Sequence, residues 1–301
     1  MNRSTKGPAR PVIFGEVLFD RFPDGRMVLG GAPFNVAWHL RGLGEDPLLI
    51  SRVGDDPSGG VVRAAMAGWG MDVAGLETDP VHPTGTVWVG FRDGEPHYEI
   101  LPDQAYDFID GGDGRMLIDP PAFLYHGSLA LRQPVSRRAL ETLARQLDCP
   151  VFMDVNLRPP WWRAGEILRW TAGADWLKLN GDELAVLVPG CDLPERKARR
   201  FLEAHFLRYL VLTQGSEGAL ALGNAGERAT VRPSLAGPVV DTVGAGDAFS
   251  AVFLLGRLRG WPLALSLERA QDFASGVVGL RGATVADPDF YRPFAEAWRA
   301  A

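Results

Sequence analysis

Near its C-terminal end the chain carries a glycine-rich turn followed by an aspartate, in Asp241-Thr242-Val243-Gly244-Ala245-Gly246-Asp247. Glycine lets a backbone turn tightly and approach a ligand, and the mostly apolar residues 248–255 predict a helix. The turn would lie at the helix N-terminus, where N–H groups and the helix dipole favour an anion. Such a cradle suits phosphoryl transfer to a hydroxyl, because amides stabilise the charge and Asp247 accepts the proton. A plain helix cap would explain the same residues.

A second glycine turn lies near the N-terminus, in Gly30-Gly31-Ala32-Pro33-Phe34-Asn35. Apolar residues at helical spacing follow it and Gly44 closes the segment, which predicts a helix. Pro33 suits the first turn of that helix. We therefore expect Asn35 to project from the start of the helix, close to the glycines.

Between these turns, short apolar segments alternate with helical ones. Strands are predicted at 48–53, 123–127, 151–155, 176–179 and 209–213, with helices between them. This pattern predicts a parallel sheet covered on both faces, in which ligands bind beyond the carboxyl ends of the strands. Polar residues lie at or just beyond the ends of three of the strands: Asp154, Asn156 and Arg158, then Asn180 to Glu183, then Thr213 to Gly218.

Two hairpins interrupt the alternation. Residues 12–20 are predicted as a first strand that ends at Asp20, and a turn at 23–25 returns the chain along 26–29. Residues 86–100 read as a hairpin around Asp93-Gly94. We expect one domain over 1–301, with a small β lid formed by about 19–30 and 84–106.

The composition is that of a globular protein of 301 residues with 46% hydrophobic residues. A net charge of −6 argues against nucleic acid as a partner. Cys149 and Cys191 lie far apart and indicate reduced thiols. The start of the chain lacks the apolar core of a signal peptide, and no apolar stretch could span a bilayer. The expected location is the cytoplasm, away from membranes.

Several other chemistries lack their motifs. None of the lysines, Lys6, Lys178 and Lys197, follows a glycine as a Walker A loop requires. A dinucleotide-binding GxGxxG fingerprint would begin at the first strand-to-helix turn, and Gly30-Gly31-Ala32-Pro33, which lies there, does not fit it. The histidines have no metal-ligand spacing, and a GxSxG nucleophile elbow is absent. After these exclusions, the interpretation that remains is an enzyme that binds nucleotide phosphates without a Walker A loop.

The two glycine motifs together resemble the two signatures of the ribokinase-like (PfkB) carbohydrate kinases. The resemblance covers about residues 12–283, and the segments at 15–20, 30–35 and 154–159 are most similar to the fructokinase branch. It implies an α/β fold of the ribokinase-like type, a three-layer αβα sandwich with a mainly parallel central sheet and a small β-sheet lid.

The resemblance also implies roles for individual residues. Asp247 matches the catalytic base, and the amides of Gly244, Ala245 and Gly246 match the anion hole. Asp20, Gly30, Gly31 and Asn35 match the sugar-binding positions. Arg158 could contact a sugar or phosphate oxygen, and a surface ion pair is the alternative for it.

For the nucleotide and metals, the implied residues lie in the second half of the chain. Asn180 and Glu183 match a motif that organises Mg²⁺, largely through water, and the pair also fits a helix cap. Thr213, Gly215 and Gly218 resemble the loop along the nucleotide phosphates. Asp241 and the Val243 carbonyl resemble part of a monovalent-cation site, which leaves K⁺ activation open.

The expected function is ATP-dependent phosphorylation of a sugar primary hydroxyl, with Mg²⁺, converting D-fructose to fructose 6-phosphate. The alternatives are 2-keto-3-deoxygluconate, ribose or a nucleoside as acceptor, and a catalytically dead binding module of the same fold. The partners would be the sugar and ATP. A homodimer formed through the lid is left open.

Overall fold

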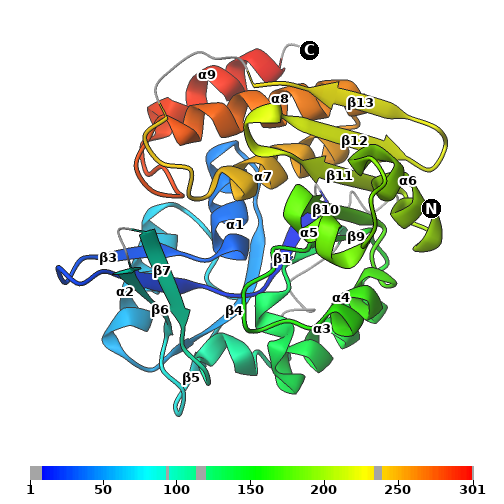
Figure 1. Ribbon diagram of the computed structural model, residues 1–301. Coiled ribbons are helices and arrows are strands. Elements are labelled where there is room, and N and C mark those ends of the chain that lie inside the picture. The colour runs from blue at the N-terminus through cyan, green and yellow to red at the C-terminus, as the bar shows by residue number, and fades with distance from the viewer. Residues whose placement is uncertain (1–8, 93–94, 113–119, 234–238, 300–301) are drawn as a thin grey trace, which may run out of the picture. The chain divides into compact units, whose positions relative to one another are not determined.

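A nine-stranded sheet runs through the fold in the computed structural model, which describes residues 9–92, 95–112, 120–233 and 239–299. The pairs β1–β4, β4–β5, β9–β10 and β10–β11 are parallel, whereas β12 pairs antiparallel with β11 and β13. The expected α/β fold with a mainly parallel central sheet is confirmed (Figure 1). The strand order is β13 (Arg228–Val231), β12 (Ala219–Gly223), β11 (Tyr209–Thr213), β10 (Trp176–Asn180), β9 (Val151–Asp154), β8 (Pro121–His126), β1 (Arg10–Phe14), β4 (Leu48–Gly54) and β5 (Leu76–Asp79).

The chain divides into two compact units. Unit 1 comprises Met1–Leu124 and Ala130–Cys149, and unit 2 comprises Tyr125–Leu129 and Pro150–Ala301. One kinase domain over the whole chain stays a prediction.

Unit 1 contains a separate four-stranded sheet, seen around the labels β3, β6 and β7 in Figure 1. Its order is β3 (Met27–Gly30), β2 (Leu18–Arg21), β6 (Gly85–Arg92) and β7 (Glu95–Ile100). Both predicted hairpins are confirmed, since β2–β3 and β6–β7 are antiparallel. They merge because β2 and β6 pair in parallel. The predicted turn residues Asp93 and Gly94 lie outside the described residues.

The predicted first strand over 12–20 is wrong in one respect, because it forms two strands in two different sheets. β1 ends at Phe14, and β2 begins at Leu18 in the small sheet. Gly15 makes the break at φ 146°, where a Cβ atom would lie 2.5 Å from Cγ of Pro33. Backbone in this region is accessible mainly to glycine.

Capping residues mark the start of α2 and the end of α1 in unit 1. Asp56 caps α2 by accepting a hydrogen bond from the Gly59 amide at 2.8 Å. Gly44, at φ 92°, follows the end of α1, as expected. The helical segments here are α1 (Ala32–Gly42), α2 (Pro57–Gly68), α3 (Pro134–Gln146) and the 3₁₀ helix η1 (Ala105–Phe108). A further 3₁₀ turn, η3, covers Leu129–Arg132.

In unit 2, α7 is the central helix. Its residues from Ala248 to Gly256 are all buried, as expected for a helix that is apolar all round. It lies beside α8 (Figure 1). Every residue of β12 is also buried, so both faces of that strand are covered. The helices are α4 (Ala164–Thr171), α5 (Gly181–Leu187), α6 (Pro194–Ala204), α7 (Ala245–Leu258), α8 (Leu263–Val278), α9 (Pro288–Arg299) and the 3₁₀ turn η4 (Gly215–Glu217).

Within the described ranges, no helix combines the length and apolar character that a bilayer crossing needs.

Candidate active site

The predicted glycine turn lies at the N-terminus of α7, in unit 2. Gly244 is the N-cap, in the left-handed conformation at φ 80°. A Cβ atom there would collide with Ala283, so both the backbone and the space require glycine. Gly244 makes no side-chain cap, and the Ala245 amide donates a long hydrogen bond of 3.3 Å to the Thr242 carbonyl. Asp247 lies half-buried in the same turn.

Gly246 differs from Gly244 because the fold itself does not require it. It has helical backbone and is exposed, and a Cβ atom would meet Nζ of Lys178 at 3.5 Å, an ordinary contact distance. Glycine in a helix costs about 0.5–1 kcal/mol relative to alanine. The absent side chain leaves the Gly244–Gly246 backbone open to a ligand, which is what a phosphate cradle needs.

A buried ion pair lies next to this turn. Nζ of Lys178, on β10, is 2.6 Å from Oδ2 of Asp154, at the end of β9, and both side chains are less than a tenth exposed. The Ser250 hydroxyl, on α7, is 2.9 Å from the same carboxylate oxygen. The Tyr125 hydroxyl contacts it more weakly at 3.5 Å. The carboxylate therefore joins two strands to the helix that carries the turn.

Asn180 and Glu183 form the helix cap that the sequence offered as one interpretation. Oδ1 of Asn180 accepts from the Glu183 amide at 2.9 Å, and Oε2 of Glu183 accepts from the Asn180 amide at 2.8 Å. Oε1 of Glu183 also accepts from the Leu157 amide at 2.8 Å. Burial raises the pKa of Glu183, and the neighbouring Asp154 charge raises it further, against these hydrogen bonds.

The predicted nucleotide loop connects β11 to β12. Thr213 ends β11, and Gly215 begins η4 with φ 56°. Gly218 is buried at φ 97°, where a Cβ atom would collide with the Val231 carbonyl of β13. Packing alone therefore requires glycine at 218, whereas nothing lies within 4 Å of a Cβ at Gly215.

Asp241 ties two loops of unit 2 together. Its Oδ1 accepts from the Val243 amide and its Oδ2 from the Gly282 amide, both at 3.0 Å. The carboxylate thus holds the segment before the glycine turn against the loop after α8. Arg158 is exposed, four residues beyond the end of β9.

The residues predicted to bind the sugar lie in unit 1. Asp20 is in β2, paired with Val28 on one side and Val87 on the other. Gly31 is the N-cap of α1, at φ 108°, and a Cβ there would lie 2.6 Å from the Glu16 carbonyl. Asn35 is 4% exposed, with its Oδ1 only 3.9 Å from where a Gly30 Cβ would be. Gly30, Gly31 and Asn35 are therefore brought together at the start of α1.

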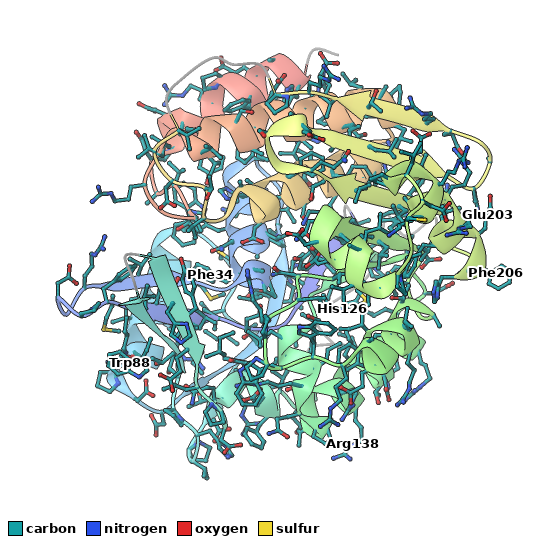
Figure 2. The ribbon with its side chains drawn as sticks, in the orientation of Figure 1. Phe34, Trp88, His126, Arg138, Glu203 and Phe206 are labelled. Atoms are coloured by element: carbon teal, nitrogen blue, oxygen red, sulfur yellow. The ribbon has the colours of Figure 1, made fainter. Side chains whose placement is uncertain are left out.

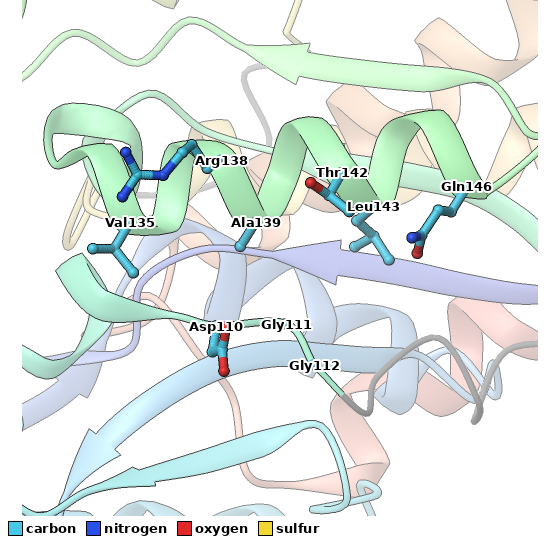
Figure 3. Close-up of a pocket in the computed structure, with 9 residues that line it drawn as sticks. All are labelled: Asp110, Gly111, Gly112, Val135, Arg138, Ala139, Thr142, Leu143 and Gln146. Atoms are coloured by element: carbon cyan, nitrogen blue, oxygen red, sulfur yellow. The ribbon is translucent and has the colours of Figure 1, made fainter.

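Unit 1 also has a cavity of about 370 Å³ between the 110–112 loop and α3, shown in Figure 3. It is lined by Asp110, Gly111, Gly112, Val135, Arg138, Ala139, Thr142, Leu143 and Gln146. None of the predicted site residues is among them, so this cavity does not belong to the candidate site.

The sequence interpretation left Lys178 and Ser250 without a role. A lysine within the apolar strand Trp176-Leu177-Lys178-Leu179 was the available signal, because a charge in a buried strand needs a partner. Ser250 gave no signal, since a small residue in an apolar helix reads as ordinary packing.

Comparison with known proteins shows the family of this chain. The family described as pfkB family carbohydrate kinase matches residues 12–289. A fructokinase of Klebsiella pneumoniae is 34% identical over 298 residues, which is 92% of this chain and 95% of that protein.

The solved structures that are similar over most of the chain include two kinases with bound ligands. Aminoimidazole riboside kinase of Salmonella enterica, complexed with aminoimidazole riboside and an ATP analogue, is 26% identical with a TM-score of 0.81. The match covers 95% of this chain and 99% of that one. A fructokinase of Vibrio cholerae, bound to fructose, ADP and calcium, is 25% identical with a TM-score of 0.78, covering 95% and 98%. This chain belongs to the pfkB family of carbohydrate kinases and is itself a carbohydrate kinase.

Proposed function

We propose that this kinase transfers the γ-phosphoryl group of ATP to the primary hydroxyl of a sugar, and that D-fructose is its preferred acceptor. The product is fructose 6-phosphate. The observation that carries the proposal is the N-terminus of α7, where an open glycine backbone and the Asp247 carboxylate lie in one helical turn.

Asp247 is the proposed base. It accepts the proton of the attacking hydroxyl, while the amides of the Gly244–Gly246 turn stabilise the charge on the transferred phosphoryl group. A protein of this fold that had lost catalysis would have no need to keep glycine at 246, where the packing tolerates a side chain. That glycine favours the enzyme over the binding module.

The sugar is proposed to bind through Asp20, Asn35 and the backbone at Gly30 and Gly31. A carboxylate and an amide can each hydrogen-bond more than one hydroxyl, which suits a polyol. The clustering of Gly30, Gly31 and Asn35 at the start of α1 supports this assignment. Arg158 is proposed to contact a sugar or phosphate oxygen.

The nucleotide is proposed to lie along Asn180, Thr213, Gly215 and Gly218. Magnesium suits these surroundings if it is carried by the phosphates. In the described part of the chain no three acidic, histidine or cysteine side chains form a ready metal cage, and Mg²⁺ characteristically keeps several waters. Glu183 is proposed to meet the ion through water, with its carboxylate held in place by the Leu157 and Asn180 amides. When bound, the ion would neutralise phosphate charge.

Potassium is the second proposed cation. Asp241 and the Val243 carbonyl would supply oxygen ligands beside the loop that follows α8. The hydrogen bond from Gly282 to Asp241 brings that loop into place. K⁺ at this position would act by ordering the turn that leads into α7.

Fructose is favoured as the acceptor by the similarity to fructokinases of two organisms. A nucleoside-like acceptor is the second candidate, because a structural relative binds aminoimidazole riboside. Ribose and 2-keto-3-deoxygluconate are further acceptors to compare.

The test is ADP release with Mg-ATP across fructose, ribose, 2-keto-3-deoxygluconate, adenosine and aminoimidazole riboside. We expect the highest kcat/KM with fructose, and a product that glucose-6-phosphate isomerase and dehydrogenase convert with reduction of NADP. A higher kcat/KM with any other acceptor would replace fructose by that acceptor. ADP release at an equal rate without any sugar would contradict the kinase assignment for this preparation.

A further inference from the structure

Ser250 presents one proton to two acceptors in the interior of unit 2. It is fully buried in α7, and its Oγ is 2.9 Å from Oδ2 of Asp154 and 2.9 Å from the Gly246 carbonyl. A hydroxyl has a single proton to donate. Hydrogen bonds to an ionised acceptor are roughly twice as strong as neutral ones. The proton therefore goes to Asp154, and the contact with Gly246 is the lesser one.

Asp154 is a firmly held anchor for that bond. It is 2% exposed and ends β9, and Lys178 is its register partner on β10 as well as its ion-pair partner. The position of the carboxylate is thus set by two neighbouring strands, independently of α7. The hydrogen bond from Ser250 to this carboxylate therefore holds α7 against the two strands.

Ser250 lies on the same side of α7 as Gly246, the last glycine of the turn. Residues four apart lie on the same side of a helix, so Gly246 lies one turn before Ser250 on this face. The position of a Gly246 Cβ, 3.5 Å from Nζ of Lys178, confirms that Gly246 is turned toward the ion pair. Asp247, the next residue, points about 100° further round the axis.

We propose that Ser250 and Asp154 are positioning residues for phosphoryl transfer. Their hydrogen bond fixes the rotation of the first turn of α7, and so aims both the Gly244–Gly246 amides and the Asp247 carboxylate. Neither residue touches the reacting atoms. The inference rests on the proposed role of the Gly244–Asp247 turn. Misplacing catalytic groups by about 1 Å can cost about 100-fold in rate. The loss of a single buried hydroxyl that positions them can therefore lower kcat strongly.

A matched control exists on the neighbouring helix. Ser266 in α8 is also fully buried, and its hydroxyl is 3.1 Å from the Pro262 carbonyl four residues earlier and 2.8 Å from Nη2 of Arg257. Ser266→Ala therefore removes the same group, from a similar environment with a charged neighbour, on a helix that carries none of the proposed site residues.

The experiment compares Ser250→Ala with Ser266→Ala. We expect Ser250→Ala to lower kcat by about 10- to 100-fold, with the sugar KM and the Kd of a non-hydrolysable ATP analogue changed by less than about threefold. Ser266→Ala should keep the wild-type kcat while Tm falls by a similar amount in both. Ser250→Thr, which restores a hydroxyl, should recover most of kcat. Equal kcat in the two alanine variants, or no recovery with threonine, would overturn the proposal.

The Asp154 arm uses a double-mutant cycle. With Asp154→Asn and Ser250→Ala, we expect the double variant to lose little more kcat than the worse single variant, because each substitution breaks the same Ser250–Asp154 hydrogen bond. If the fold-decreases in kcat of the two single variants multiply in the double variant, the two residues act independently and the proposal is wrong. If Asp154→Asn does not fold, the Ser250 comparison decides. Failure of the proposed function looks different, because the wild-type enzyme itself would then show no sugar-dependent ADP release.

Discussion

Lys178 on β10 and Asp154 on β9 are register partners whose charged atoms lie 2.6 Å apart in the interior of unit 2. A buried pair of this kind is costly to assemble and more costly to break, since the surviving charge is left without a partner. The pair therefore ties the stability of unit 2 to two side chains at the edge of the candidate site.

The first prediction concerns that stability. Lys178→Met keeps most of the side-chain volume but leaves Asp154 buried alone, so the free energy of unfolding in urea should fall by about 3–5 kcal/mol. The matched control is the exposed pair of Arg228 and Glu195, whose atoms are 2.8 Å apart. Arg228→Met should change the unfolding midpoint little. Equal shifts in the two variants would mean that burial of the Lys178 pair has no energetic consequence.

The second prediction addresses the proposed base. Asp247→Asn keeps the shape of the side chain and removes the proton acceptor. We expect kcat to fall by about 10²- to 10⁴-fold, with Tm and the Kd for ATP almost unchanged. Stopped-flow ADP release measures kcat, calorimetric titration measures the Kd for ATP, and thermal unfolding measures Tm. Turnover close to wild type would remove Asp247 from the mechanism.

A third prediction separates function from stability at Gly246. Gly246→Ala should stabilise the fold by about 0.4–1 kcal/mol, because alanine suits helical backbone and has space there. It should nevertheless lower kcat/KM for ATP by about tenfold or more, since the methyl group would stand in the path of the phosphates.

Gly165 is the control for this substitution. It is likewise the second residue of its helix, α4, is exposed, and has nothing within 4 Å of a Cβ. Gly165→Ala should give a similar gain in stability with unchanged kinetics. If both variants keep wild-type kcat/KM, the phosphates do not approach Gly246.

The fourth prediction is a pH dependence of stability that arises from His126. This residue lies inside the fold at the end of β8 (Figure 2), and burial lowers its pKa to about 4, against a hydrogen bond from Nδ1 to the Gly127 carbonyl and the Asp154 charge. Between pH 4 and 6.5 the unfolded chain binds more protons than the folded one. Stability contributed by neutral His126 is therefore complete above about pH 6.5 and is lost as the pH falls toward 4.

His126→Gln removes this titration. The difference in unfolding free energy between wild type and the variant should grow by roughly 3 kcal/mol from pH 4 to pH 7 and stay constant above that. Urea denaturation at several pH values provides the measurement. A difference that does not vary with pH would show that His126 titrates normally in the folded protein.

Local sequence patterns were sufficient to predict those elements whose structure depends on residues close together in the chain. The hairpin at 18–30, the cap at the start of α5 and the turn before α7 each depend on residues a few positions apart. Those short-range patterns predicted the elements correctly. The break at Gly15 escaped because it depends on Pro33, which is remote in sequence.

Gly218 and Gly246 also show what the sequence could predict and what required the structure. Gly218 was assigned to the nucleotide loop by resemblance, yet its own requirement comes from the Val231 carbonyl on a neighbouring strand. Gly246 was predicted for phosphate approach, and the structure adds that no packing demand competes with that role. Only neighbours in space distinguish these two reasons for a missing side chain.

The amino-acid sequence alone predicts a βα protein with two glycine turns, and it leads to the proposal that Asp247 serves phosphoryl transfer. These features can be predicted because each depends on a short, contiguous motif. The ion pair of Lys178 with Asp154 and the bond from Ser250 were decided only by tertiary structure. They join β9, β10 and α7, and the register between elements so distant in sequence is set by packing rather than by any local pattern.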